Sequence, residues 1–234
     1  MPKPHRIASA KQLDDAVTAL IAVDRRLRPV VKRAGHPKFV SRRRHGFEAL
    51  MEIITSQQLS IAAADTIFGR LKERVAPFDP PTLLATPADV LRACGLSAPK
   101  QKHMKTIAAA ILDGSLDLKR VRRLADHDAR EHLTAIKGIG PWTADIYLMS
   151  SLGRADVWPV ADVGLQAAIT RVLKLKKRPN EKQMEKLSRI WQPWRTIVAR
   201  LFWTHEDGIR QEKRDAEKRA KALKAAKAKK QAKR

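Results

Sequence analysis

The residues best suited to chemistry lie late in the chain. Asp162 follows Pro159-Val160-Ala161, comes 20 residues after Trp142 and precedes an apolar helical run. At a helix N-terminus, a carboxylate is stabilised by the helix dipole and by free backbone N–H groups, which favours its ionised form. An ionised carboxylate can stabilise a developing positive charge or activate a water molecule. Asp is also a favoured helix cap, so a purely structural role is an equally good interpretation of Asp162 from its position alone.

A tight turn is expected upstream of this acid, in Lys137-Gly138-Ile139-Gly140-Pro141. Gly138 and Gly140 permit a positive φ or a close approach of the backbone, and Pro141 suits the first turn of a new helix because its missing N–H is not needed there. The free N–H groups at that helix start are a natural place to bind a DNA phosphate. We therefore predict two helices joined by a phosphate-binding hairpin.

The charge balance points to the same kind of partner. The 234 residues carry 48 Lys and Arg against 24 Asp and Glu, a net charge of +24. Residues 210–234 hold 12 basic and 3 acidic residues, so a net charge of +15 remains for residues 1–209. Basic side chains that neutralise phosphates release counterions, which raises affinity without sequence preference. The charge therefore indicates a polyanionic partner for the body of the protein and not only for its tail.

The elements that position these residues are predicted to be helical. Apolar residues recur at intervals of three and four, and no segment alternates with period two for long enough to indicate a sheet. We predict an all-α fold in which two of the apolar stripes flank the polar joint Thr55-Ser56-Gln57-Gln58. These stripes are Phe47, Leu50, Met51 and Ile54, and then Ile61, Ala64, Ile67, Phe68 and Leu71.

Two further segments are expected to lack packed helices. The segment from Arg28 to His45 contains Pro29, Gly35 and Pro37 among basic residues, and we predict that it is a connection. The last packed helix is expected to run from Trp194 to Glu206. The Lys/Ala-rich tail after it has almost no apolar face, so we predict that it is disordered or a lone solvated helix.

Cysteine content and hydropathy exclude several classes of protein. The single cysteine, Cys94, rules out an intramolecular disulfide, a zinc ribbon and a four-cysteine iron–sulfur cluster. No apolar run approaches the length of a membrane span, and the N-terminus lacks the apolar core of a secretory signal. We expect a soluble, cytoplasmic monomer that needs no cofactor.

The hairpin and the spaced acid also resemble a known family. Together with Ser56-Gln57-Gln58-Leu59-Ser60, Pro193-Trp194-Arg195 and Trp203, they are similar to the helix–hairpin–helix (HhH-GPD) DNA glycosylases, and specifically to the bacterial 3-methyladenine DNA glycosylase II family. The similarity extends from about Phe47 to Thr204. A hairpin alone is weak evidence because many DNA-binding proteins contain one. The combination of hairpin, spaced Asp and Gln-Gln joint is much more specific.

The resemblance implies two helical subdomains with a cleft between them. It divides the chain into an N-terminal helix and connection (1–45) that pack with the C-terminal helices, a subdomain with the hairpin at about 129–151 (46–160), the C-terminal helices (161–207) and a basic tail (208–234). Some members carry an additional N-terminal β domain. Because the Gln-Gln joint arrives at residue 57, we expect a compact member without this domain.

The resemblance also implies the roles of individual residues. Asp162 corresponds to the catalytic carboxylate, in preference to Asp145 and Asp156, which lack the match. Trp142 stands where the bifunctional branch has a lysine that forms a Schiff base, so no strand-cutting lyase step is expected. The damaged base would lie against Trp142, Trp203, Ile146 and Phe47. Ile146 replaces a Tyr of the best-known members, which leaves the base preference open.

The remaining implied roles concern DNA. Gln58 or Leu59 would fill the gap left by a base that is flipped out of the duplex. Lys137, Gly138, Ile139 and Gly140 would bind backbone phosphate, and the carbonyls of Ile136 and Gly138 would hold a monovalent cation. No catalytic metal is expected.

The function implied is a monofunctional glycosylase of base excision repair. It would flip alkylated purines such as 3-methyladenine and 7-methylguanine out of duplex DNA and hydrolyse the N-glycosidic bond. These bases are cationic, so stacking on indole adds a cation–π interaction of ~0.5–2 kcal/mol. Two alternatives are a non-enzymatic helix–hairpin–helix DNA-binding protein and a glycosylase for a mismatched or oxidised base.

Overall fold

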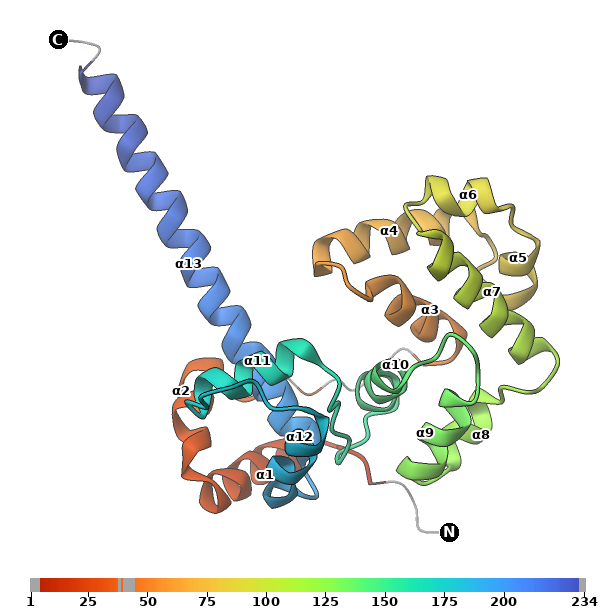
Figure 1. The fold of residues 1–234 in the computed structure, drawn as a ribbon, viewed down its shortest axis with the longest axis horizontal. Coiled ribbons are helices and arrows are strands. Elements are labelled where there is room, and N and C mark those ends of the chain that lie inside the picture. The colour runs from red at the N-terminus through yellow and green to blue at the C-terminus, as the bar shows by residue number, and fades with distance from the viewer. Residues whose placement is uncertain (1–4, 38, 40–44, 232–234) are drawn as a thin grey trace.

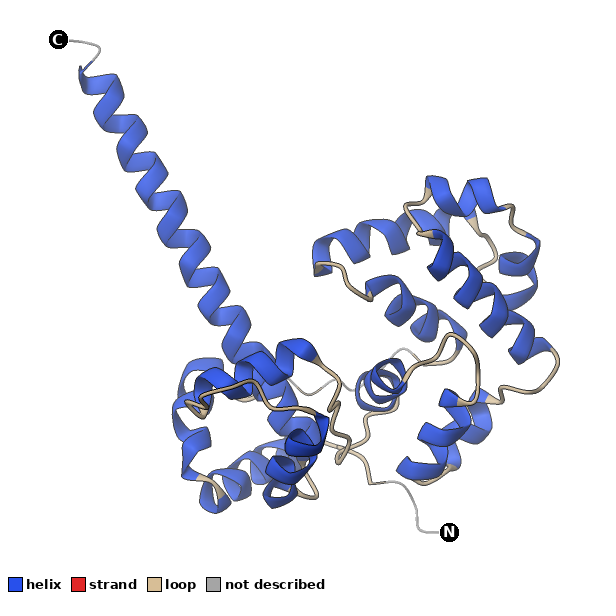
Figure 2. Cartoon of the chain, in the orientation of Figure 1, coloured by secondary structure: helices blue, strands red, loops and turns tan. Residues whose placement is uncertain are grey.

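The computed structural model describes residues 5–37, 39 and 45–231. Over these residues the chain forms thirteen α-helices and no strand, which confirms the all-α fold (Figure 2). The helices form two groups, to the right and to the lower left in Figure 1, and we refer to them as the first and second lobes. None of the described helices is both long and apolar enough to cross a membrane.

The first lobe contains the middle of the chain. Helices α3 and α4 pack against each other, α7 contacts α3, α5 and α6, and α9 contacts α8 and α10. A π-helix, η2, continues α10. The elements are α3 (Phe47–Ser56), α4 (Ile61–Arg74), α5 (Pro80–Ala85), α6 (Ala88–Ala93), α7 (Ala98–Leu112), α8 (Leu118–Arg123), α9 (Asp126–Thr134), α10 (Pro141–Ile146) and η2 (Tyr147–Ser151).

The second lobe joins the two ends of the chain. Helix α13 contacts α1, α2 and α11, so the N-terminal helices pack with the C-terminal ones. The elements are α1 (Ala10–Val23), the 3-10 turn η1 (Arg25–Leu27), α2 (Arg28–Ala34), α11 (Val163–Val172), α12 (Glu181–Ser188), the 3-10 turn η3 (Arg189–Trp191) and α13 (Arg195–Gln231). The division of the chain at residues 45, 160 and 207 stays a proposal.

The second lobe is built around buried tryptophans. The rings of Trp158 and Trp191 lie 5.3 Å apart, and Trp191 also packs against Phe202. Trp191 Nε1 donates a hydrogen bond to Oδ2 of the buried Asp24 at 3.0 Å. The pKa of Asp24 lies below its usual value, because its hydrogen bonds with Arg26 and Trp191 outweigh the effect of burial. These contacts make the lobe a fixed support for α11 and α13.

The link between the lobes is anchored by a buried arginine. Arg154 has no exposed surface, and its Nη2 donates to the carbonyls of Val121, Arg122 and Leu124 at the end of α8. Its Nη1 lies 3.2 Å from Asp126 Oδ1. The guanidinium thereby satisfies the free carbonyls of a helix end and fixes the loop that leads to the second lobe.

Three sequence predictions need correction. The predicted connection from Arg28 forms helix α2, because Pro29 lies in the first turn, where a helix needs no N–H from it. The part of that connection at 38 and 40–44 lies outside the described residues. Ile61 was predicted to belong to the apolar stripe of α4 but is 73% exposed at the start of that helix. The last helix does not end at Glu206 but continues to Gln231.

Candidate active site

The predicted hairpin is formed by α9 and α10. Gly138 lies in the turn with φ +103°, and a Cβ at this residue would stand 2.9 Å from His103 Cβ, so only glycine allows the turn to rest on α7. Ile139 is buried and its N–H donates to the Ile136 carbonyl at 3.0 Å. Lys137 and Gly140 are exposed. The turn therefore presents its backbone and Lys137 to solvent while Ile139 anchors it.

The loop between α3 and α4 faces this hairpin. Gln57 Nε2 donates to Thr143 Oγ1 at 2.9 Å, which ties the loop to α10. Lys100 Nζ donates to the carbonyls of Thr55 and Gln57, both at 2.7 Å, and burial lowers the pKa of this lysine. The end of α3 is thus held from two sides. This arrangement fixes the position from which the next residues project.

The residues that follow, Gln58 and Leu59, are exposed. Gln58 has φ +57°, the left-handed conformation that a non-glycine residue adopts at a cost of roughly 1–2 kcal/mol. Leu59 keeps 41% of its surface exposed. A strained backbone and an uncovered apolar side chain at a tightly held loop are typical of a site that contacts another molecule.

Asp162 caps the N-terminus of α11 and is held by three N–H groups. Leu165 N donates to Oδ1 at 2.5 Å, Trp142 Nε1 donates to Oδ2 at 2.7 Å, and Trp203 Nε1 donates to Oδ1 at 3.3 Å. The donors come from α11, α10 and α13, so both lobes contribute to the orientation of the carboxylate. The structural and chemical interpretations of Asp162 are therefore compatible.

The hydrogen bonds leave part of the carboxylate available. An ionised carboxylate has about four lone-pair sites, two on each oxygen. Oδ1 accepts two of the three N–H groups and Oδ2 accepts one, so one site on Oδ2 has no donor among the contacts described. A water molecule or a cationic substrate atom can use this site.

The segment before Asp162 is also fixed. Gln166 Nε2 donates to the Val160 carbonyl at 2.8 Å, and Asp162 N donates to the Pro159 carbonyl at 3.0 Å. A Cβ at Gly164 would lie 3.2 Å from Asp162 Oδ1, which is a crowded contact. Glycine at this position therefore leaves room for the carboxylate.

These elements surround a cleft of about 1000 Å³ between the two lobes. The hairpin, the α3–α4 loop, the start of α7 and the start of α11 each contribute to its wall. Its lining comprises Gln57, Gln58, Ser97, Pro99, Lys100, His103, Thr134, Ile136, Lys137, Gly138, Ile139, Gly140, Pro141, Trp142, Thr143, Ala161, Asp162, Val163, Gly164 and Glu181. The structure thus brings Asp162, Trp142, Gln58 and the hairpin into one cleft.

Three residues predicted for the base pocket are not among the residues that line this cleft. Trp203 touches the Asp162 carboxylate but does not line the cleft, and Ile146 is partly buried against the core. Phe47 packs against Phe78, with ring centroids 5.5 Å apart, and lines a second cavity together with Tyr147. Phe47 is thus separate from the residues that line this cleft, and its role in the base pocket stays a prediction.

Sequence patterns alone missed several lining residues. Lys100, His103, Val163 and Glu181 all line the cleft. Lys100 and His103 share one face of α7, but nothing in the sequence says which face of that helix meets the hairpin. Val163 is 58% exposed although it begins an apolar run, and such exposure became visible only in the fold.

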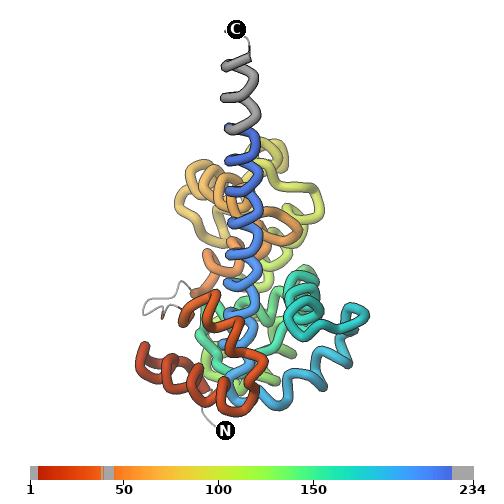
Figure 3. Tube along the Cα trace, turned by 90° about the vertical axis from the view of Figure 1, so that its left-hand side faces the viewer, coloured from red at the N-terminus to blue at the C-terminus, as the bar shows by residue number. Residues whose placement is uncertain are grey.

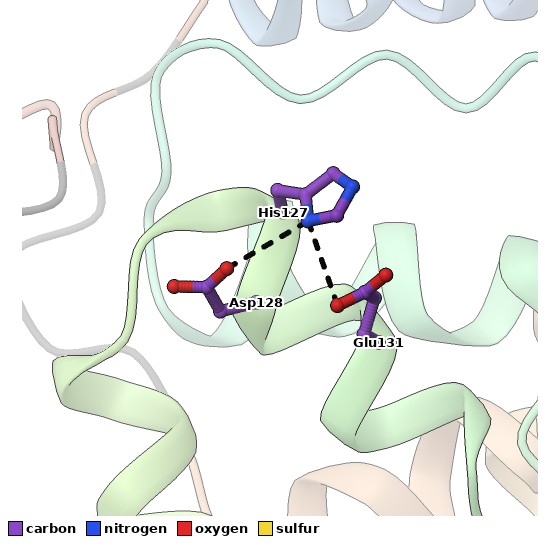
Figure 4. Close-up of side chains that lie close together, drawn as sticks. All are labelled: His127, Asp128 and Glu131. Carbon is purple, nitrogen blue, oxygen red and sulfur yellow. Dashed lines mark ion pairs between the residues drawn. The ribbon is translucent and has the colours of Figure 1, made fainter.

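An exposed cluster on α9 has a different character. His127, Asp128 and Glu131 lie on its first turns, with His127 Nδ1 3.7 Å from Asp128 Oδ1 and 3.6 Å from Glu131 Oε2 (Figure 4). The three side chains are largely open to solvent and come from one helix. Their distances are those of weak surface ion pairs, so we assign the cluster no role in the site.

Comparison with known proteins shows the family of this chain. The model of the HhH-GPD superfamily of base excision DNA repair proteins matches residues 51–193. DNA-3-methyladenine glycosylase 1 of Schizosaccharomyces pombe is 34% identical over 197 residues, which cover 82% of this chain and 86% of that protein. The putative DNA-3-methyladenine glycosylase YfjP of Bacillus subtilis is 32% identical over 67% of this chain and 58% of its own.

Solved structures show the same similarity in three dimensions. The S. pombe 3-methyladenine DNA glycosylase in complex with abasic DNA superposes with a TM-score of 0.73 at 32% identity, covering 81% of this chain and 95% of that one. The DNA-3-methyladenine glycosidase of Bacillus halodurans gives a TM-score of 0.67 at 33% identity, with coverages of 80% and 87%. Fold, motif and sequence agree, and the chain belongs to the HhH-GPD superfamily of base excision DNA repair proteins.

Proposed function

We propose that this protein is a monofunctional DNA glycosylase that removes alkylated purines of the 3-methyladenine and 7-methylguanine type from duplex DNA. The observation that carries the proposal is the Asp162 carboxylate, held by two indole N–H groups and a helix N-terminus in a cleft bordered by the hairpin. The relatives named as 3-methyladenine glycosylases support the substrate class.

Binding begins with the DNA backbone. The exposed Lys137 and the turn residues Gly138 and Gly140 offer a positive charge and backbone N–H groups to a phosphate. Gln58 and Leu59, on the loop opposite, enter the space that the flipped base leaves. Filling this space lowers the cost of flipping, which is a few kcal/mol and smallest for damaged pairs. The predicted monovalent cation would lie at the carbonyls of Ile136 and Gly138.

The chemical step depends on Asp162. As the bond between the base and C1′ breaks, the sugar acquires positive charge, and the free lone-pair site on Oδ2 can stabilise that charge or orient the attacking water. The leaving base is already cationic, and the indole of Trp142 lines the cleft where such a base can stack. The products are the free base and an abasic site in an intact strand.

The proposal that no lyase step follows base release is based on Trp142. A lyase requires an amine that attacks C1′ and forms a Schiff base, and an indole cannot do so. Among the described residues, Lys100 and Lys137 are the lysines that line the cleft, but Lys100 Nζ donates to two backbone carbonyls and Lys137 belongs to the proposed phosphate-binding turn. We further propose that the protein acts as a monomer in the cytoplasm.

The test uses single-lesion duplexes with purified protein. We expect release of 3-methyladenine and 7-methylguanine, measured by chromatography, and a strand that breaks only after alkali treatment. A panel that adds ethenoadenine, hypoxanthine and 8-oxoguanine shows the range of substrates. Borohydride added during the reaction should capture no covalent protein–DNA complex.

Other outcomes point to the alternatives. Tight duplex binding without release of any base would identify a non-enzymatic DNA-binding protein. Release of an oxidised or mismatched base alone would place the chain in another branch of the superfamily. A complex trapped by borohydride would contradict the assignment of Trp142.

A further inference from the structure

The C-terminal half of α13 leaves the body of the protein. Helix α13 continues unbroken from Arg195 to Gln231, while from Arg210 to Ala222 nearly every residue is exposed. Ion pairs between Arg33 and Glu212 and between Arg171 and Glu206 hold the helix where it departs. Figures 1 and 3 show it projecting well beyond the second lobe.

The charge of this projecting segment changes along its length. Near the body, from Asp207 to Glu217, basic and acidic residues are mixed. From Lys218 to Arg234 the sequence contains nine basic residues and no acidic one. Such a run of like charge repels itself in a helix unless anions neutralise it. Charge complementarity therefore indicates a polyanion along the outer part of α13.

The root of the helix lies at the candidate active site. Trp203 of α13 donates to Oδ1 of Asp162, which lines the cleft, so α13 passes directly behind the cleft wall and runs outward from there. At 1.5 Å per residue, Lys218 lies about 22 Å and Gln231 about 42 Å along the axis from Trp203. One turn of B-DNA is about 34–36 Å. The part of α13 without acidic residues therefore lies about as far from the cleft as one turn of DNA is long.

The direction in which α13 projects is also consistent with a DNA duplex bound at the cleft. In Figure 1, α13 and helices α3–α7 extend upward on opposite sides of α10 and α11, and the turned view in Figure 3 shows α13 extending the same way. The cleft residues come from α10, α11 and the loop at the end of α3. DNA seated at the cleft would thus have α13 beside it.

We propose that the projecting part of α13 is a second DNA-binding element that contacts backbone phosphates up to about one helical turn from the damaged base. This inference rests on the proposed function, because it takes the cleft as the place where the duplex sits. The binding of this element to DNA depends neither on the base sequence nor on the presence of a lesion. It keeps the enzyme on undamaged duplex while the hairpin and Asp162 examine single bases.

The test compares duplex binding by the full-length protein and a triple variant, Lys218→Gln, Arg219→Gln and Lys221→Gln. Gln has nearly the helix propensity of Lys, so the helix is retained. Binding to undamaged duplex is measured by fluorescence anisotropy over a range of salt concentrations. Each lost phosphate contact lowers the slope of log K against log salt by about 0.9, so we expect a slope smaller by up to about 3 and an affinity at least roughly tenfold lower near 0.1 M salt.

Duplex length locates the contact. Shortening the arm on one side of the lesion to about half a turn should weaken binding by the wild type but not by the triple variant, since one B-DNA turn is about 34–36 Å. The matched control, Lys218→Arg with Lys221→Arg, keeps the charge and should bind as the wild type does. Base release at saturating enzyme should be equal in all three proteins.

Each other result has a definite meaning. Equal affinity and salt slope in the wild type and the triple variant would overturn the proposal. So would a loss of binding to single-stranded RNA or anionic vesicles with duplex binding unchanged, because α13 would then serve another polyanion. If no protein releases a base but duplex binding still depends on the three residues, the proposed enzymatic function fails and the DNA-binding role of α13 stands.

Discussion

Two aspartates on neighbouring elements show how the environment separates structure from chemistry. Asp145 in α10 has no exposed surface, and its Oδ1 lies 2.5 Å from Arg130 Nη2 of α9. Burial raises the pKa of Asp145 to about 7, although the guanidinium of Arg130 opposes the shift. Asp162 instead borders an open cleft and accepts three N–H groups.

The difference in burial between Asp145 and Asp162 indicates which of the two can act on a substrate. Asp145 joins the two helices of the hairpin but has no path to the cleft, whose lining does not include it. Asp162 is oriented by neutral donors that leave one lone-pair site free. The raised pKa of Asp145 thus reflects its burial in the protein interior, whereas the candidate for catalysis is recognised by its access to the cleft and by its hydrogen-bond donors.

The largest effect expected in free energy concerns Asp145. Its pKa is higher in the folded protein than the ordinary value of 3.8, so its contribution to stability is full below about pH 4 and is lost as the pH rises through about 7. At 1.36 kcal/mol per pKa unit, the loss is at most roughly 4 kcal/mol. Asp145→Asn should flatten this part of the pH dependence in urea unfolding.

The activity of Asp145→Asn tests whether Asp145 takes part in the reaction. Asp145→Asn should release bases from DNA as fast as the wild type under conditions in which both proteins are folded. Loss of base release in a folded Asp145→Asn protein would break the separation between the structural and the reactive aspartate. An unaltered pH dependence of stability would show that another group dominates it.

A smaller effect is expected from the tryptophans that orient Asp162. Trp142→Phe removes the 2.7 Å hydrogen bond to Oδ2, and a bond to a charged group contributes about 1.5–3 kcal/mol. The rate of base release should therefore fall about 10- to 100-fold. Trp203→Phe removes the longer 3.3 Å bond and should have a smaller effect. Single-turnover rates measure both.

Affinity for undamaged duplex serves as the control for these two variants, and it should not change. If Trp203→Phe slowed the reaction more than Trp142→Phe, the orientation of Asp162 would depend chiefly on α13. The hydrogen-bond lengths would then be a poor guide to which donor matters.

Much of the site could be predicted from sequence because its signals are local. The hairpin depends on Gly138 and Pro141, whose backbone requirements are visible in their residue types, and Asp162 precedes an apolar helical run. The structure places these residues in one cleft. The positions of Trp142 and Trp203 beside Asp162 followed from the family resemblance and not from their spacing.

The errors concern contacts between distant segments. Periodicity shows that a helix has an apolar face but not which residue at its end remains covered, which is why Ile61 was counted in the apolar stripe although it is exposed. Periodicity also cannot tell which cavity a helix end faces, and Phe47 at the start of α3 lines a cavity other than the cleft with Asp162. The continuity of α13 was missed because the tail has almost no apolar face to mark it as part of a packed helix, although a lone solvated helix was one of the two predicted states.

The central claim is that Asp162 performs the chemistry, and the most direct measurement is the single-turnover rate of 7-methylguanine release by Asp162→Asn. Asn caps a helix about as well as Asp, so the fold should survive. Duplex binding should be retained, and the rate should fall at least about 100-fold. Glu181→Gln provides the comparison, because Glu181 is the other carboxylate among the described lining residues. An undiminished rate in Asp162→Asn, or a loss confined to Glu181→Gln, would contradict the account.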